Sequence, residues 1–263
     1  SLGIINIAPP EGFGLIDFEM SLFDAKAKAI QAKMSKIRDK KSATLESIVK
    51  SGRAYKNKAD ILFRLAEART QETKYQYLLA REKYEKALAC YEEKRCTAEP
   101  QEPAKDLSTS LVYYRQISKE YPDYRRIDEV IYHLGRGAVD KGKHKKDVQL
   151  QKEGVRRLSN LVQKYPKSRY VPQAHLALAE YYFENDSLFY AKTNYEKIVT
   201  NFSNHPTLAY ALYKLGWIYV ALQERERAAT VFKRVLASLG AGGSAAKEKF
   251  RGHVSACLSF VER

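Results

Sequence analysis

The sequence predicts an all-α protein built as a solenoid of stacked helical hairpins, and three observations support this prediction. Apolar side chains recur at helical spacing through residues 208–239, on both sides of a polar break at residues 223–227. Small residues, Gly216 and Ala228, stand where two helices must touch, and large residues stand where a gap must be filled. Glycine (13) and proline (8) are too sparse for a turn-rich sheet protein. A hairpin of this kind cannot bury both of its faces alone, so it stacks on neighbouring hairpins.

The composition fits such an array and excludes several other classes. A chain of 263 residues is long for one ordinary core, whereas hairpins can be added in series because each contacts only its neighbours. The content of 44% hydrophobic and 29% charged residues is typical of a globular protein and not of a disordered one. No run approaches the ~18 apolar residues that cross a bilayer. The first ten residues lack the basic region and the cleavage site of an intact signal peptide.

The charge and the cysteines give weaker indications. A net charge of +15 favours an anionic partner or surface in general terms. Lysines occur in every segment and are interleaved with acidic residues, however, which is typical of the solvated exterior of helices. The three cysteines form neither a disulfide scaffold nor a zinc pattern. We expect unpaired thiols at Cys90 and Cys96. The alternative is a bridge between them, if a helix ends there, which would suit an oxidising compartment.

The first 57 residues divide into two segments. Residues 1–17 hold two adjacent prolines and many apolar residues, so we expect an extended segment that lies in a groove of the molecule or on a partner. In the N-terminal helical region, residues 18–57, apolar residues step by three and four as in the seam of a coiled coil. The stripe fades at Lys41, so we expect an amphipathic helix packed on the first hairpin. The alternative is a short coiled coil for self-association through residues 18–40. The stripe consists of Met20, Phe23, Ala27, Ile30, Met34 and Ile37.

The packing pattern recurs through residues 58–239. In the first hairpin, Ala66 falls in the first helix and Ala80 in the second, so we expect a turn between them. A stretch with two prolines and no large apolar residue, at residues 96–106, predicts an exposed loop. A helix of the second type follows from Leu107 and is closed by Tyr121-Pro122, because proline cannot continue the hydrogen-bond ladder. Its packing positions are Ser110, Tyr114 and Ile117.

The next hairpin is longer than the others. Its packing glycines, Gly135 and Gly154, are 19 residues apart, whereas Gly216 and Ala228 are 12 apart, which indicates an insertion of seven residues. We place the insertion in a strongly basic turn between the two helices. That turn contains Lys141, Lys143, His144, Lys145, Lys146 and Lys152.

The C-terminal part of the chain is regular up to its last segment. Residues 171–199 predict a hairpin of ordinary length, and the hairpin of residues 208–239 follows it. After a glycine-rich break, residues 240–263 predict either a capping helix with a polar outer face or the start of a further repeat. The apolar face of this last helix consists of Phe250, Val254, Leu258 and Val261.

These packing positions resemble those of the tetratricopeptide repeat, a helical hairpin of 34 residues. The stretch QKYPKSRYVPQAHLALAEYYFENDSLFYAKTNYEKIV is similar to the bacterial cell-envelope branch of this family. That branch includes Tol-Pal-associated, outer-membrane-assembly and gliding-motility proteins, and NKADILFRLAEA is most similar to the gliding-motility set. In residues 208–239, the positions that carry the resemblance are Leu212, Leu215, Gly216, Tyr219, Ala228, Phe232 and Val235.

The resemblance covers residues 58–239 and has several implications. It implies a right-handed superhelix that acts as a non-catalytic protein–protein interaction scaffold, with a partner peptide or helix in the concave groove. The partner would be a subunit of a bacterial envelope complex. The chain would lie in the periplasm or cell envelope, peripheral to the membrane and not integral to it, with the cytoplasm as the alternative location.

No pattern of catalytic or metal-binding residues occurs. The five histidines have no partner at metal-ligand spacing, and the HExxH motif, the nucleophile elbow and the P-loop are missing from the sequence. We therefore expect no enzymatic activity, no metal and no cofactor.

The candidate binding residues lie between the packing positions of the first helix of each hairpin. Such positions point into the groove of a stacked array, and aromatic residues beside a few charges are typical of binding hot spots. We expect the single tryptophan, Trp217, to anchor a bound segment. The alternative for the tyrosines is packing between neighbouring repeats. The predicted partner-binding residues are Trp217, Tyr213, Tyr210, Phe183, Glu180, Gln173, Tyr132 and Arg136.

An alternative function is the binding of a polyanion by the basic region of residues 141–157. Nucleic acid, anionic lipid and a cell-wall polymer share the phosphate or carboxylate groups that such a region attracts, although we expect nucleic acid least. The candidate residues are Lys141, Lys143, Lys145, Lys146, Arg156 and Arg157.

Overall fold

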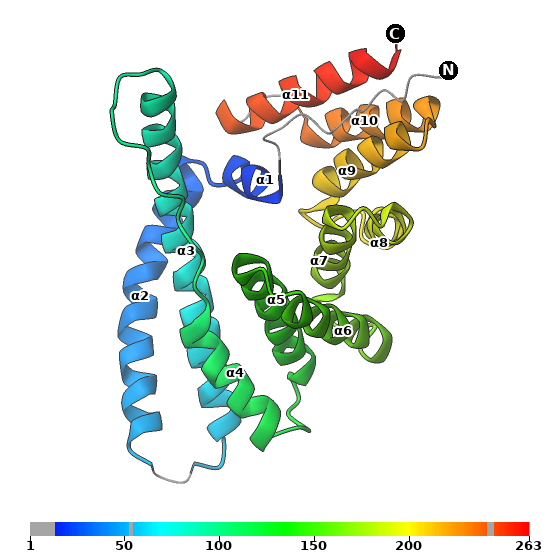
Figure 1. The fold of residues 1–263 in the computed structure, drawn as a ribbon. Coiled ribbons are helices and arrows are strands. Elements are labelled where there is room, and N and C mark those ends of the chain that lie inside the picture. Colours follow the sequence, from blue (N-terminus) through cyan, green and yellow to red (C-terminus); the bar gives the residue numbers. More distant parts are fainter. Residues whose placement is uncertain (1–13, 53–54, 241–244, 263) are drawn as a thin grey trace.

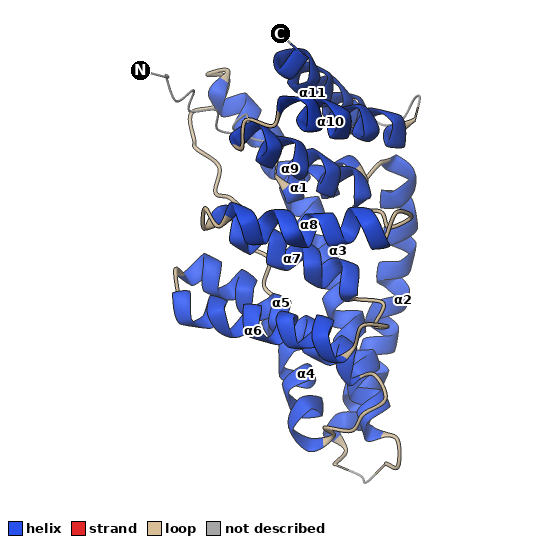
Figure 2. Ribbon diagram, turned by 90° about the vertical axis from the view of Figure 1, so that its right-hand side faces the viewer, coloured by secondary structure: helices blue, strands red, loops and turns tan. Residues whose placement is uncertain are grey.

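The computed structural model describes residues 14–52, 55–240 and 245–262, and the regular structure within these ranges is entirely helical (Figure 1, Figure 2). The predicted all-α repeat fold is confirmed. The helices are α1 (Leu15–Ser21), α2 (Ala25–Lys50), α3 (Lys58–Glu92), α4 (Ser108–Glu120), α5 (Ile127–Lys145), α6 (Val148–Lys164), α7 (Val171–Glu184), α8 (Leu188–Asn201), α9 (Leu208–Ala221), α10 (Arg225–Leu239) and α11 (Ala245–Glu262).

Helices that follow one another in the chain pack against one another, as expected of a solenoid. The hairpins α5/α6, α7/α8 and α9/α10 are stacked through contacts of α6 with α7 and of α8 with α9. At the two ends of this stack, α4 lies against α3 and α5, and α11 lies against α10. Figure 1 shows α5 and α7 on the side of the hairpins that faces α3. Helix α1 is the exception to sequential packing, because it contacts the last helix, α11.

Small residues allow the helices of each hairpin to cross closely. A Cβ atom on Gly216 would clash with the ring of Phe232, and one on Gly154 would lie 2.6 Å from the carbonyl oxygen of Gly135. Ala179 is fully buried. The prediction that Gly135 and Gly216 lie where the helices of a hairpin touch is confirmed.

Three clusters of buried side chains share the described part of the molecule. The largest joins α7 to α11 with Phe18 of α1, the second joins α3, α4 and the beginning of α5, and the third joins α5, α6 and α7. The predicted positions Ser110, Tyr114 and Ile117 are buried in or beside the second cluster, which confirms the helix expected before Tyr121-Pro122.

The turn expected between Ala66 and Ala80 does not exist, because α3 is one continuous helix of 35 residues. Its sequence contains neither glycine nor proline and consists largely of good helix formers, so nothing interrupts it. The packing partner of its N-terminal half is α4. The interval between Ala66 and Ala80 therefore suggested a hairpin where there is none.

The prediction of a long basic turn in the hairpin of α5 and α6 is also wrong. α5 continues to Lys145 and α6 begins at Val148, so the additional residues extend both helices and leave a tight turn. Gly142 allows this extension, because a Cβ atom there would lie 2.7 Å from the backbone nitrogen of Gln151. Most of the lysines assigned to the turn therefore lie on helices.

The N-terminal region differs from the prediction in two respects. Residues 1–13 lie outside the described residues, and the last residues of the segment expected to be extended belong to α1, from Leu15 onward. Helix α2 forms and packs along α3, but Ile30, Met34 and Ile37 of its apolar stripe are exposed to solvent. Phe23 of the stripe does pack against Tyr75 of α3, with ring centres 6.2 Å apart, but the part of the stripe from Ile30 onward does not mediate the packing that the sequence suggested.

Cys90 and Cys96 form a disulfide bond where α3 ends, with their Cα atoms 5.3 Å apart. The expectation of unpaired thiols at these positions is therefore wrong, and the alternative of a bridge is correct. The helix ends at Glu92, which lets the chain turn back and bring the two sulfur atoms together. Cys257 is a free, buried thiol.

Candidate partner-binding surface

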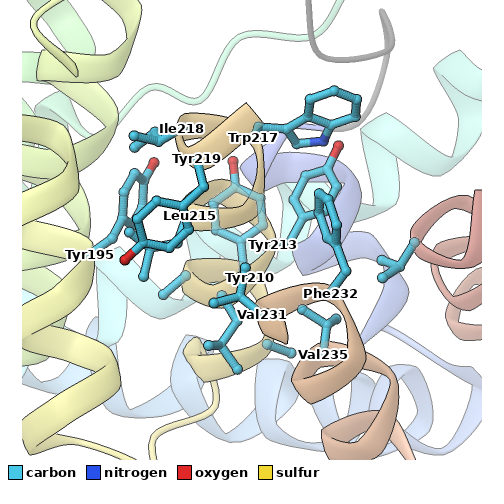
Figure 3. Close-up of a cluster of buried hydrophobic side chains, with 14 of the residues drawn as sticks. Tyr195, Tyr210, Tyr213, Leu215, Trp217, Ile218, Tyr219, Val231, Phe232 and Val235 are labelled. Carbon is cyan, nitrogen blue, oxygen red and sulfur yellow. The ribbon is translucent and has the colours of Figure 1, made fainter. Parts of the chain in front are cut away.

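The aromatic residues of α9 form the centre of the largest buried cluster (Figure 3). Tyr210 and Tyr213 have no exposed surface, and Trp217 is 5% exposed. The rings of Tyr213 and Trp217 lie 6.4 and 5.9 Å from the ring of Phe232 on α10. These residues therefore follow the alternative in which the tyrosines pack between helices. They do not form an open groove wall in this conformation.

Helix α1 covers part of the surface that the sequence analysis assigned to a partner. Phe18 is 3% exposed, and its ring lies 5.5 Å from that of Tyr210 and 5.6 Å from that of Phe250 on α11. The backbone N–H of Gly14 donates to Asp17 at 2.7 Å, which holds the first turn of α1. Helix α1 thus occupies a site that α9 and α11 form together.

Glu180 of α7 is tied to its neighbours. It accepts hydrogen bonds from the hydroxyl groups of Tyr195 and Tyr210, and the Nζ atom of Lys214 lies 3.6 Å from its carboxylate. Lys214 Nζ also lies 3.5 Å from the centre of the Phe183 ring. Burial lowers the pKa of Lys214, while the carboxylate of Glu180 opposes this shift. Glu180 is thus a bridging residue between α7 and α9.

Arg136 belongs to a second charged group, which connects α5 to the loop after α3. Its Nε atom lies 2.9 Å from Asp140, and Lys105 Nζ lies 3.5 Å from the other oxygen of the same carboxylate. Lys105 Nζ is also 5.7 Å from the centre of the Tyr77 ring on α3. Burial alone would raise the pKa of Asp140, but the charges of Arg136 and Lys105 lower it below its usual value. The carboxylate is therefore kept ionised by two cations.

Lys74 lies one turn before Tyr77 on α3, close to this group. Burial and the nearby charge of Lys105 lower its pKa. Its side chain nevertheless retains solvent exposure, and among the described residues it forms no hydrogen bond or ion pair. Lys74 is therefore an exposed cation of α3 without an ion pair, and the more distant charges of Glu19 and Asp140 oppose the lowering of its pKa.

Gln173 and Phe183 are two further predicted residues on α7. Both are half-buried, and the Oε1 atom of Gln173 has no hydrogen-bond partner among the described residues. Tyr132 is nearly buried and stacks on Tyr170, with ring centres 4.4 Å apart. Lys143 of α5 reaches Glu184 of α7 at 2.6 Å.

We call the charged, polar and aromatic residues of α3, the loop after it, α5, α7 and α9 that are described above the inner strip. Ion pairs join α5 to α7 and α7 to α9 along it, and Lys105 joins α5 to the loop beside α3. The strip consists of Lys74, Tyr77, Lys105, Arg136, Asp140, Lys143, Gln173, Glu180, Phe183, Glu184 and Lys214.

Comparison with known proteins identifies the repeat type. A family model described as outer membrane lipoprotein matches residues 58–180, and a model described as tetratricopeptide repeat matches residues 210–238. The chain is a tetratricopeptide-repeat protein. The first match supports the bacterial envelope branch, and both are families of non-catalytic, scaffold-type proteins. No curated protein matches the chain.

The tetratricopeptide array shows no sign of an ion-binding or membrane-spanning element within the part that the structure describes. No group of three or more histidine, cysteine, aspartate or glutamate side chains is placed to hold a metal ion there. None of the described helices is both long enough and apolar enough to cross a membrane.

The residues predicted to bind a polyanion do not form one patch on the array. Lys141, Lys143 and Lys145 occupy the last turns of α5, whereas Arg156 lies near the middle of α6, about 12 Å along the helix from its first residue. Lys143 is paired with Glu184, as described above. Arg157 donates to Glu153 at 2.6 Å. The basic region is therefore divided and partly neutralised.

Arg156 and Arg157 instead border a small open cavity of about 240 Å³ at the outer side of α5 and α6. Among the described residues, Arg156 and Lys164 form no ion pair. Sequence reasoning missed Lys164, because it follows the basic region by two helical turns and looked like an ordinary helix-end lysine. The cavity is lined by Ile131, Arg156, Arg157, Asn160, Lys164 and Tyr165.

Proposed function

We propose that this protein is a non-catalytic scaffold of a bacterial envelope complex and that it binds a segment of another protein along the inner strip. The observation that supports this proposal is the unmet polar capacity there. Lys74 forms no ion pair and Gln173 has an unsatisfied carbonyl oxygen among the described residues. Lys74 is exposed to solvent and Gln173 is half-buried, so a bound chain can supply a carboxylate to the first and an N–H donor to the second.

The partner segment is defined by the chemistry that it meets. A carboxylate would pair with Lys74, an N–H group would donate to Gln173, and an apolar side chain would contact Phe183. Arg136, Glu180 and Tyr132 would position these contacts and would not make new ion pairs, because their polar groups already have partners or are buried. Phe183 replaces Trp217 as the proposed anchor, since Trp217 is in the core.

Site-specific photo-crosslinking tests this proposal. A photoreactive amino acid would replace Lys74 or Gln173, and exposed Lys152 on α6 would serve as the outward-facing control. In an envelope extract of the source bacterium, we expect the two inner positions to capture the same protein and position 152 not to capture it. Equal capture from all three positions, or from none, would contradict binding at the inner strip.

We also propose that the protein is located in the periplasm. The Cys90–Cys96 disulfide supports this location, because disulfides persist in oxidising compartments. Outer-membrane assembly and gliding motility are the two settings that the family resemblance suggests. Alkylation of free thiols in intact cells, before lysis, would detect the bridge directly. A fully reduced pair in cells would argue for the cytoplasm.

A second candidate function is the binding of an anionic polymer, and the cavity beside Arg156 is the observation that favours it. Three cations converge on one space of about 240 Å³ that also offers Asn160 and Tyr165. We expect inorganic polyphosphate to bind with an affinity that falls steeply between 50 and 200 mM salt. The double change Arg156→Ala, Lys164→Ala should abolish this binding, and Lys141→Ala, Lys145→Ala should not. The reverse pattern would assign the binding to the end of α5.

A further inference from the structure

Helix α2 directs the polar side of its first part, up to Ser42, toward the protein, whereas Val49 near its end packs on the second cluster. Toward α3 it directs Lys28, which pairs with Glu82 at 2.5 Å, and Ser35 and Arg38, which bond to Glu72 at 2.8 and 2.9 Å. Arg38 is only 9% exposed. An amphipathic helix normally buries its apolar side, so this inversion requires an explanation.

The apolar residues of α2 face solvent instead. Ile30 is 50% exposed, Met34 is 42% exposed and Ile37 is 56% exposed. They follow one another at intervals of four and three residues, which is the spacing of a coiled-coil seam. Figure 1 shows α2 at the edge of the molecule with α3 beside it. We call Ile30, Met34 and Ile37 the α2 seam.

A row of lysines borders the α2 seam on its solvent side. Lys26, Lys33 and Lys40 recur every seven residues and fall at the helical position next to Ile30 and Ile37. None of the three forms an ion pair with a described residue. In a coiled coil, this flanking position carries the charges that select the partner.

The charges argue against a second copy of the chain as the occupant of the seam. In an antiparallel pair, the three lysines would face the same lysines of the other copy. In a parallel pair, Lys33 would face Arg38, which is buried against α3. Like charges in these positions are destabilising. Self-association through residues 18–40, which the sequence left open, is thus disfavoured.

The width of the seam argues against a membrane surface. A helix that lies in a membrane interface presents an apolar arc of about 100° or more, often with Trp, Phe or Leu. Here the apolar row is one residue wide, with Lys33 and Lys40 at one edge and Arg38 at the other. Such a narrow row matches the knobs of one facing helix.

We propose that the α2 seam is a second protein-binding site, which takes a single helix of another protein with apolar residues at coiled-coil spacing and acidic residues at the flanking positions. This site is separate from the inner strip and does not depend on it. The facing helix would cover Ile30, Met34 and Ile37, and its carboxylates would pair with Lys26, Lys33 and Lys40. The array would then hold two partners, one on its inner side and one on its outer edge.

The test uses the whole protein and two synthetic peptides of three heptads, measured by fluorescence anisotropy. Both peptides carry Leu or Ile in the seam positions; one carries Glu and the other Lys at the flanking positions. We expect the Glu peptide to bind at least about tenfold more tightly than the Lys peptide. The protein variant Ile30→Gln, Ile37→Gln should lose binding of the Glu peptide without loss of helical content, because both side chains are exposed.

The control variant is Val112→Gln on α4, where a valine of similar exposure (56%) lies outside the seam. It should bind the Glu peptide as the unchanged protein does. Three results would overturn the proposal. The first is that the Glu peptide fails to bind. The second is that the protein forms a dimer and that Ile37→Gln abolishes this dimer. The third is that phosphatidylglycerol vesicles bind the protein through the α2 seam while the Glu peptide does not bind.

Discussion

The absence of a side chain at Gly216 allows α9 and α10 to cross, and the same residue type has a different role in α11. Around Gly216, three atoms of the Phe232 ring lie within 3 Å of where a Cβ atom would be. Around Gly252, no atom lies within 4 Å of that position. The two glycines are therefore a matched pair for measuring the value of close helix contact.

We predict opposite effects on stability for alanine at these positions. Gly216→Ala should lower the free energy of unfolding by about 1–3 kcal/mol, because Phe232 is fully buried and must shift. Gly252→Ala should raise it by up to about 1 kcal/mol, since alanine favours the helix. Urea denaturation followed by circular dichroism measures both. Equal effects of the two changes would contradict the packing described here.

His133 is a second residue whose burial has a measurable consequence. It is 7% exposed and stacks on Tyr114, with ring centres 4.5 Å apart. Burial, followed by the charge of Lys74, lowers its pKa from 6.5 to about 3. Below pH 6.5 the unfolded chain therefore binds a proton that the folded chain does not bind until the pH approaches 3. This difference lowers the free energy of unfolding as the pH falls through that window.

We predict that His133→Phe makes the free energy of unfolding less dependent on pH between 6.5 and 4. Phenylalanine keeps the stacking on Tyr114, and the Nε2 atom of His133 has no hydrogen-bond partner in the described residues, so little is lost at neutral pH. Urea denaturation at a series of pH values measures the slope. An unchanged slope would show that His133 does not carry this share of the acid sensitivity.

At the scale of elements, the Cys90–Cys96 bridge closes the end of α3. The loop that follows is drawn back along the helix by Arg81, whose Nη1 atom lies 2.6 Å from Glu102. A bridge over a separation of six residues removes a modest amount of chain entropy from the unfolded state. Its stabilisation is therefore small and concentrated near residues 86–107.

We predict that loss of the bridge lowers the local free energy of opening by about 2 kcal/mol. In the variant Cys90→Ser, Cys96→Ser, hydrogen exchange should accelerate in residues 86–107 and remain unchanged in α7 to α10, which the bridge does not contact. Reduction of the unchanged protein should reproduce this result. Acceleration spread over the whole chain would contradict a local role.

The regular hairpins could be predicted from sequence, because their signal is local. In α7 and α8, Ala179, Ala191 and Tyr195 fall at packing positions within one short segment, and all three are fully buried. The same pattern of packing positions was misleading in α3, where Ala66 and Ala80 fit a hairpin and a continuous helix equally well. Only the absence of a glycine or proline between them could have decided the question.

The binding surface was less accessible to sequence reasoning, because its exposure depends on distant parts of the chain. Tyr210 occupies a groove position of its repeat, but Phe18 covers it from the other end of the sequence. Lys105 was assigned to an exposed loop, yet it packs over Tyr77 and reaches Asp140. No local pattern indicates such contacts between distant segments.

At the scale of the whole molecule, the three buried clusters behave as units that contact only their neighbours, and α1 is added to one of them. Phe18 belongs to the cluster of α7 to α11 and makes no contribution to the other two. In a nearest-neighbour array, a local loss of packing destabilises adjacent units and leaves distant ones unchanged.

We therefore predict that Phe18→Ala acts on one end of the array only. Removal of this buried ring should cost about 3–5 kcal/mol within its cluster. Hydrogen exchange should accelerate in α1, α9 and α11, and the fluorescence of Trp217 should shift to longer wavelength as its cluster loosens. Protection of amide hydrogens in α5 and α6 should not change. These helices cross at Gly135 and Gly154, and their buried side chains belong to the third cluster, which does not contain Phe18. If α5 and α6 lose protection together with α11, the chain folds as one cooperative unit and the nearest-neighbour description does not hold.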